Sequence, residues 1–261
     1  MEYIEELEKQ NIFVKCFVNP IIPEMGHRWR TAVIVCPGGG YSVLGKRDAD
    51  PVALRFQAYG MQSFVFEYTV GKGCYQIACN HLAILINYLR KVEVYQKYDI
   101  DPNRIVLVGF SAGAHLATSI ACYWKKISRQ LELSCCRPNA LITIYPVITS
   151  NVYAHEESVN NCVGIGNLTK DEFSLELHIP NDMPPCFIVH CVDDENVSVM
   201  NSILFMEALK KNNIEFEAHI FPKGGHDFAF ADDCTARIES QVNERCSIWF
   251  TLALKWIEEV L

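Results

Sequence analysis

One serine of the chain lies in a pattern that can activate a hydroxyl group: Gly109-Phe110-Ser111-Ala112-Gly113, which fits G-x-S-x-G. A serine hydroxyl is a weak nucleophile until a neighbouring base takes its proton, and that base needs an orienting carboxylate. In this pattern the serine sits on a tight strand-to-helix turn, where the flanking glycines allow close backbone contact. A β-prone run, Ile105 to Val108, precedes the motif and helix-prone residues follow it. The sequence therefore predicts Ser111 as a nucleophile.

A base for this serine is predicted at His226, within Gly224-Gly225-His226-Asp227-Phe228. This segment follows a strand predicted to end at Phe221, so it should form a loop at one end of a sheet. His190 lies in an apolar run and is expected to be buried, and His115 is expected to brace the turn after the serine. No pair of histidines has HExxH or another metal-binding spacing, and we predict neither a metal nor another cofactor.

The carboxylate that orients the base should fall between the serine and the histidine in the chain. Asp193 and Asp194 follow the apolar run Cys186 to Val192, which is the expected place. Because the two residues are adjacent, periodicity alone leaves both open. Whichever does not orient the base is expected to cap the helix predicted to begin near Ser198.

A glycine run offers the amides that acyl transfer requires. Negative charge develops on the carbonyl oxygen during acyl transfer, and preorganised backbone N–H groups stabilise it. Cys36-Pro37-Gly38-Gly39-Gly40-Tyr41 follows an early strand, and we predict Gly39 and Gly40 as donors, together with the amide of Ala112. A phosphate loop is disfavoured, because neither GxxxxGK[ST] nor GxGxxG with a partner acid is present.

Composition limits the classes of protein that remain. Half of the 261 residues are hydrophobic, which suffices for one large domain, and the net charge of −8 with scattered basic residues argues against nucleic-acid binding. The chain begins with an acidic segment that lacks signal-peptide features, and no apolar run is long enough to cross a membrane. We expect a cytoplasmic protein without membrane partners. Its twelve cysteines are expected to be reduced thiols, and its oligomeric state, a homo-oligomer included, is left open.

The positioning elements follow from apolar runs that alternate with segments of helical period, which predicts an α/β fold with a mostly parallel sheet. Strands are predicted at residues 12–18, 31–36, 62–68, 104–108, 140–145, 186–192 and 214–221. Helices are predicted at residues 51–59, 75–98, 112–124, 198–212 and 238–260. The segment 149–185 is polar and carries three prolines, and we predict a lid or cap insertion there within a single domain, 1–261.

Taken together, these features resemble the α/β-hydrolase superfamily, and within it small acetyl esterases, xylan esterases and sugar-hydrolase homologues. The similar segments are CPGGGY at 36–41, GFSAGAH at 109–115, Tyr145-Pro146, PPCFIVH at 184–190, DDENV at 193–197 and GGHDF at 224–228.

The resemblance implies the α/β-hydrolase fold and a serine esterase acting on short acyl, especially acetyl, esters of small molecules, including acetylated sugars. The family pattern D-x-x-V assigns the orienting acid to Asp194, with Asp193 as the alternative. Tyr41 is assigned to substrate binding. The chain departs from the hormone-sensitive-lipase branch at Pro37, which replaces the histidine of HGGG, and at Ala114, which replaces a second glycine. That branch also has an N-terminal helical cap, for which there is no room before residue 38.

Two other functions remain compatible with the sequence. A formamidase or peptidase could cleave amides on the same scaffold. A non-catalytic binding protein could retain only the fold, although the presence of all three residue types argues against this.

Overall fold

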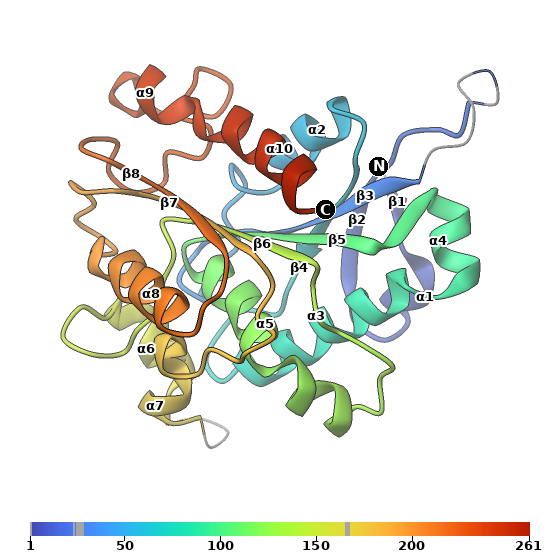
Figure 1. Cartoon of the computed structure of the whole chain (residues 1–261), viewed down its shortest axis with the longest axis horizontal. Helices are drawn as coiled ribbons and strands as arrows, with labels where there is room; N and C mark the ends of the chain where they lie inside the picture. Colours follow the sequence, from blue (N-terminus) through green and yellow to red (C-terminus); the bar gives the residue numbers. More distant parts are fainter. Residues whose placement is uncertain (1, 23, 25–28, 165–167) are drawn as a thin grey trace.

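The computed structural model describes residues 2–22, 24, 29–164 and 168–261, which form an eight-stranded sheet covered by helices (Figure 1). The strands follow the order β1-β2-β4-β3-β5-β6-β7-β8. The pairs β1–β2 and β2–β4 are antiparallel, and all later neighbours are parallel. The strands are β1 (Glu2–Tyr3), β2 (Phe13–Phe17), β3 (Arg30–Cys36), β4 (Gln62–Glu67), β5 (Ile100–Phe110), β6 (Ala140–Ile144), β7 (Cys186–Cys191) and β8 (Phe216–Phe221).

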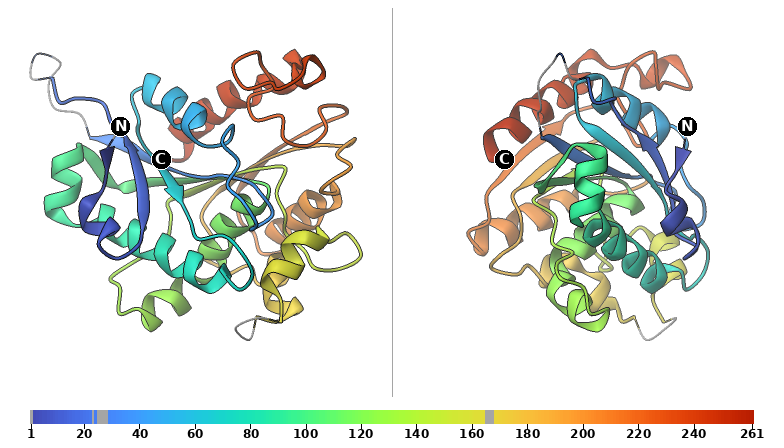
Figure 2. Two further views of the ribbon diagram at one scale, coloured as in Figure 1. Left: turned by 180° about the vertical axis from the view of Figure 1, so that it is seen from behind. Right: turned by 90° about the vertical axis from the view of Figure 1, so that its right-hand side faces the viewer.

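Helices pack on both faces of the sheet, because alternate strand residues point to opposite faces (Figure 2). On β5, Ile105 and Leu107 join the core beneath α3 (Tyr75–Leu89), α5 (Ala112–Gln130) and α8 (Met200–Lys211). Val106 and Val108 join the second core, beneath α2 (Asp50–Ala58) and α10 (Trp249–Val260). The continuous apolar runs in the sequence reflect this two-sided burial.

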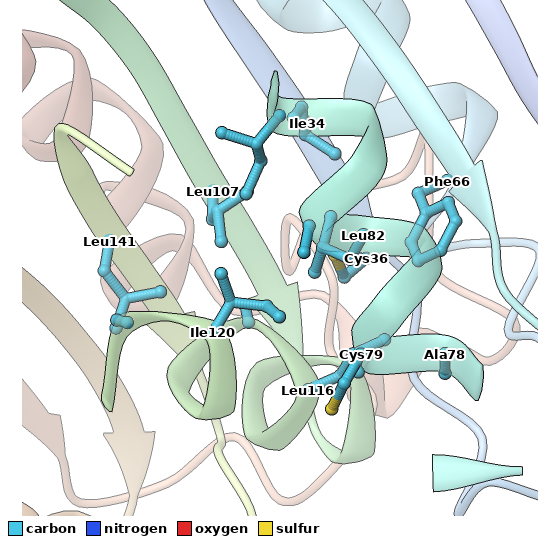
Figure 3. Packing of buried hydrophobic residues seen from close by; sticks show 14 of the residues in the cluster. Ile34, Cys36, Phe66, Ala78, Cys79, Leu82, Leu107, Leu116, Ile120 and Leu141 are labelled. Atoms are coloured by element: carbon cyan, nitrogen blue, oxygen red, sulfur yellow. The ribbon is translucent and has the colours of Figure 1, made fainter. Parts of the chain in front are cut away.

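The first of these cores holds the crossover helices against the central strands. Figure 3 shows Leu82 of α3 and Leu116 and Ile120 of α5 packed near Ile34 of β3 and Leu107 of β5. All of these side chains have no exposed surface. This packing fixes the start of α5, which directly follows Ser111.

Several element bounds differ from the predictions. The helix predicted at 75–98 is broken into α3 and α4 (Val92–Tyr98) by extended backbone at Lys91, with φ −67° and ψ 140°. The C-terminal helix predicted at 238–260 is a 3₁₀ turn (Glu239–Gln241), α9 (Glu244–Ser247) and α10, because Asn243 caps a new helix start with its side chain. The sequence also missed β1 and α1 (Glu5–Glu8).

The segment 149–185, predicted to be a lid or cap insertion, contains two helices and a 3₁₀ turn among its described residues: α6 (Glu156–Cys162), α7 (Lys170–Phe173) and Leu175–Leu177. Buried serine and threonine hydroxyls tie it down. Ser150 Oγ donates to the Lys170 carbonyl at 2.8 Å, and Thr149 Oγ1 donates to Glu176 at 2.6 Å. Its role as a lid stays a prediction.

The loops after β3, β5, β7 and β8 all lie at the carboxyl edge of the parallel strands. They carry the glycine run, Ser111, the Asp193-Asp194 pair and His226, so the topology places the predicted site residues at one edge. In the described part of the chain, no helix has the length and apolar character needed to span a membrane. All twelve cysteines are free thiols, and nine of them are buried.

Candidate active site

Ser111 occupies a sharp turn between β5 and α5 with backbone angles φ +51° and ψ −119°. Such positive φ is costly for a residue with a side chain, and it persists because the turn is packed on both sides. A Cβ on Gly109 would lie 2.4 Å from Ala114 Cα, and one on Gly113 would lie 2.2 Å from the Cys36 carbonyl oxygen. A side chain at either glycine of the motif would therefore clash with the backbone of its neighbours.

The structure brings Ser111, His226 and Asp194 into one hydrogen-bonded line. His226 Nε2 lies 2.9 Å from Ser111 Oγ, and His226 Nδ1 lies 2.6 Å from Asp194 Oδ2. His226 is on the loop between β8 and the 3₁₀ turn, and Asp194 follows β7. In this arrangement Nδ1 donates to the carboxylate and Nε2 is free to accept the serine proton.

Asp194 is surrounded by hydrogen-bond donors. The sequence predicted the one from His226, but not those from His190 and the backbone. Its Oδ1 accepts the backbone N–H groups of Asn196 and Val197 at 3.0 and 2.9 Å, and its Oδ2 faces both His226 and His190. Burial would raise the pKa of Asp194, but the hydrogen bonds from His190 and His226 lower this pKa well below its usual range. Asp194 is thus a stable anion beside His226.

Asp193 has a different place. Its Oδ1 accepts the backbone N–H groups of Gly224 and Gly225, each at 2.9 Å. It was expected, as the alternative to orienting the base, to cap the following helix; instead it fixes the loop that carries His226. The two adjacent carboxylates therefore hold the side chain and the backbone of the histidine segment respectively.

The glycine loop approaches Ser111 from β3. Gly39 has φ +126°, and a Cβ there would lie 2.2 Å from the Val43 carbonyl oxygen, so only glycine fits. Within the described residues, the N–H groups of Gly39, Gly40 and Ala112 have no hydrogen-bond acceptor in the protein. These are the three amides predicted as oxyanion donors, and they remain available to a ligand.

Tyr41 requires a correction. Its side chain has no exposed surface, and its hydroxyl lies 2.7 Å from His115 Nδ1. His115 Nε2 in turn donates to the Phe173 carbonyl at 2.9 Å, and burial lowers the pKa of His115 to about 4. A side chain held in this way cannot reach a substrate, so Tyr41 packs beneath the glycine loop. His115 braces the region, as expected.

Tyr145, noted in the sequence only as part of Tyr145-Pro146, is a direct neighbour of the site. Its ring centroid lies 4.6 Å from that of His226, and its hydroxyl donates to Asp48 Oδ1 at 3.1 Å. Its own φ is +39°, an unusual angle for a tyrosine, so the backbone turns here to direct the ring at His226. A non-glycine residue with positive φ leaves no signal in the sequence that could have revealed it.

The segment 149–185 contributes two side chains near the site. Glu157 accepts a hydrogen bond from Ser42 at 2.6 Å and packs against Gly40. His155 caps α6 through Nδ1, which accepts from Ser158, and burial together with the nearby His226 lowers the pKa of His155. Both residues lie on the predicted lid, and neither was singled out in the sequence.

Comparison with known proteins identifies the family. Residues 21–209 match the BD-FAE family, a range that includes Ser111 and Asp194 and ends before His226. The chain belongs to the BD-FAE family. A crystal structure of an acetyl ester-xyloside bifunctional hydrolase from Caldicellulosiruptor lactoaceticus is 31% identical, with a TM-score of 0.80 over 95% of this chain and 88% of that one.

Two curated relatives of this BD-FAE chain are longer proteins. Endo-1,4-beta-xylanase B of Butyrivibrio fibrisolvens is 34% identical over 78% of the chain and 33% of the relative. An acetylxylan esterase of Xylanibacter ruminicola is 29% identical over 76% of the chain and 41% of the relative. The chain thus spans less than half the length of either. The predicted α/β-hydrolase fold is confirmed, and the proteins that the chain resembles include esterases and xylan-acting hydrolases.

Proposed function

We propose that this BD-FAE chain is a serine carboxylic-ester hydrolase that removes short acyl groups, with Ser111 as nucleophile, His226 as base and Asp194 as orienting acid. One observation carries the proposal: His226 contacts Ser111 Oγ at 2.9 Å through one ring nitrogen and Asp194 at 2.6 Å through the other. This is the geometry that a serine needs to lose its proton as it attacks.

The reaction proceeds in two steps. His226 Nε2 takes the Ser111 proton while Oγ attacks the ester carbonyl, and the resulting oxyanion is stabilised by the amides of Gly39, Gly40 and Ala112. His226 then protonates the leaving alcohol. Water, deprotonated by His226, attacks the acyl-enzyme and releases the acid. Asp194 stabilises the imidazolium in both halves because it stays ionised.

The surroundings of His226 favour an ester whose alcohol portion carries several further hydroxyl groups. An open groove begins beside its ring and is lined by polar side chains, which can donate and accept hydrogen bonds: Asp193, Glu195, Asn196, Asp227, Arg237 and Gln241. The names of the acetylxylan esterase and of the acetyl ester-xyloside hydrolase fit such an alcohol. We propose acetylated sugars or xylo-oligosaccharides as substrates.

The nucleophile is tested by Ser111→Ala, with Ser134→Ala as matched control because Ser134 is exposed and lies after α5, away from the site. Wild type and the control should hydrolyse p-nitrophenyl acetate and react with a fluorophosphonate probe, whereas Ser111→Ala should do neither. Unchanged turnover in folded Ser111→Ala would contradict the proposal. A wild-type protein inert to every ester and to the probe would instead favour the binding-protein alternative.

The substrate class is tested with a hydrolysis panel. Acetyl, butyryl and octanoyl p-nitrophenyl esters should be cleaved in decreasing order, and acetate should be released from acetylated xylo-oligosaccharides. N-formylkynurenine and aminoacyl amides serve as the comparison. Cleavage of these amides without ester turnover would contradict the esterase assignment.

A further inference from the structure

The carboxyl group of Asp48 is buried inside the loop that carries the oxyanion donors. Asp48 is only 4% exposed, and its Oδ2 would lie 3.0 Å from a Cβ on Gly38 and 3.1 Å from one on Gly45. The loop closes around it, because the Gly45 N–H donates to the Gly38 carbonyl at 2.8 Å. The same Cβ on Gly38 would lie 3.2 Å from Ser111 Cβ, so the carboxyl group and the serine flank one glycine.

Tyr145 connects this carboxyl group to the histidine segment. Its hydroxyl donates to Asp48 Oδ1 at 3.1 Å and accepts the backbone N–H of Ala229 at 3.3 Å. Ala229 is held in turn, since its carbonyl accepts the Trp249 indole N–H at 2.9 Å. The tyrosine ring lies against His226, with centroids 4.6 Å apart. Asp48 and Ala229 therefore hold the Tyr145 hydroxyl in place, while the Tyr145 ring packs against the imidazole of His226.

We propose that Asp48 is a positioning residue of this site, whose ionised carboxylate holds Tyr145 against His226 and thereby couples the oxyanion loop to the base. The inference rests on the proposed function, because it assigns a role in that reaction. A neutral carboxyl would be the ordinary state for a group so deeply buried, and an ionised one requires the hydrogen bond and the positive charge that face it.

The charges around Asp48 come from several elements. Burial raises the pKa of Asp48 to about 6, and the Asp227 carboxylate adds to this increase. The Tyr145 hydroxyl, the adjacent Arg47 and the imidazole of His226 act in the opposite direction and favour the ionised form. Tyr68 of the β4 end also lies near the carboxyl group, and its hydroxyl donates to the Pro37 carbonyl at 2.7 Å. Since Asp48 and His226 attract each other when charged, protonation of Asp48 also removes support from the imidazolium.

This role predicts that two protonation events, and not one, reduce kcat/KM at low pH. If both Asp48 and His226 must be deprotonated, log kcat/KM falls with a slope that approaches about two at low pH, and with a slope of about one if His226 acts alone. The slope separates an ionisation that the reaction uses from a purely structural contact, which would scale the rate without changing the number of protons.

The test measures kcat and KM for p-nitrophenyl acetate between pH 4.5 and 8.5 for wild type, Asp48→Asn, Tyr145→Phe and the control Asp50→Asn. Asp50 begins α2, directly after the loop that holds Asp48, and pairs with Lys15 at 3.2 Å instead of facing the site. Asp48→Asn should lower kcat with little change in KM and reduce the acid-limb slope to about one. Tyr145→Phe should shift the acid limb to higher pH, because Asp48 loses the hydrogen bond that favours its ionised form. Asp50→Asn should follow wild type.

Each result bears on a different statement. If wild type and Ser111→Ala are equally inactive, the proposed function fails and the role of Asp48 fails with it. If wild type is active but folded Asp48→Asn keeps the wild-type slope, only the role of Asp48 is overturned. If Asp48→Asn does not fold, Tyr145→Phe decides, because an acid limb that stays in place overturns the inference.

Discussion

His190 and Asp194 are joined by a contact of 3.1 Å between Nε2 and Oδ2, and neither side chain is exposed to solvent. The oxygen involved is the one that also faces His226. Since an ionised carboxylate only accepts hydrogen bonds, His190 carries its proton on Nε2, which it shares with the Val197 carbonyl at 3.0 Å. Nδ1 then accepts from Ser202 Oγ at 2.8 Å. A strand histidine, expected only to be buried, thus helps to keep Asp194 ionised.

We expect His190→Ala to lower kcat by about ten- to hundredfold, because a hydrogen bond to a charged group contributes about 1.5–3 kcal/mol. Steady-state kinetics on p-nitrophenyl acetate would show this fall, with KM nearly unchanged. Ser202→Ala should lower kcat less, because it removes the hydrogen bond to His190 Nδ1 but leaves the His190 ring beside Asp194. A folded His190→Ala protein with wild-type kcat would show that His226 and the backbone amides suffice.

The two adjacent aspartates should separate clearly by mutation. Asp194→Asn should reduce kcat by about 10⁴-fold, because the amide cannot stabilise the imidazolium and favours the wrong tautomer. Asp193→Asn keeps an oxygen that can accept from Gly224 and Gly225, so its kcat should fall by less than about tenfold. The measurement is kcat for both variants under one set of conditions. Comparable losses would contradict the division of roles that their hydrogen bonds indicate.

Most of the fold was predictable because the burial pattern is simple. Strands such as β3 and β5 are buried on both faces and therefore appear as continuous apolar runs. The interruptions were not predictable to the same degree, because they depend on single backbone conformations. Lys91 breaks one predicted helix with ordinary extended angles, and Asn243 starts a new helix with a side-chain cap. The apolar positions keep their helical spacing on both sides of these two residues, so the sequence pattern alone does not show either interruption.

The candidate site was predictable where chemistry is tied to local motifs, as at Ser111 and the glycine loop. It was not predictable where residues far apart in the chain meet. Asp48 and Tyr145 are separated by 97 positions, and only the sheet brings their side chains together. Tyr41 shows the converse, because its place beside the glycines suggests exposure whereas its ring turns into the core.

Gly113 should be the least replaceable residue of the serine motif. A Cβ there would lie 2.2 Å from the Cys36 carbonyl oxygen and 2.3 Å from that of Pro37, so Gly113→Ala must displace the glycine loop. We expect a loss of more than about 4 kcal/mol in the free energy of unfolding, or failure to fold. Gly60→Ala is the control, since its Cβ meets nothing within 4 Å and only its φ of +86° opposes it, at about 1 kcal/mol. Urea unfolding measures both, and equal losses would contradict the packing argument.

Asp48 should cost the protein stability at neutral pH. Burial raises its pKa from 3.8 to about 6, so between these values the folded protein binds a proton that the unfolded chain has released. The stability associated with Asp48 is therefore complete below pH 3.8 and is lost as the pH rises through about 6. Asp194, whose pKa is lowered, has the opposite dependence, but it is present in wild type and in variants of Asp48 alike.

Asp48→Asn removes this dependence because an amide is neutral at every pH. The difference in unfolding free energy between the variant and wild type should increase in favour of the variant by up to about 3 kcal/mol from pH 4 to pH 8. Urea unfolding at pH 4, 6 and 8 measures it, with Asp50→Asn as control. A variant more stable at pH 8 yet slower in ester hydrolysis would indicate that the buried carboxylate is retained for the reaction. A difference that does not change with pH would mean that Asp48 titrates normally in the folded protein.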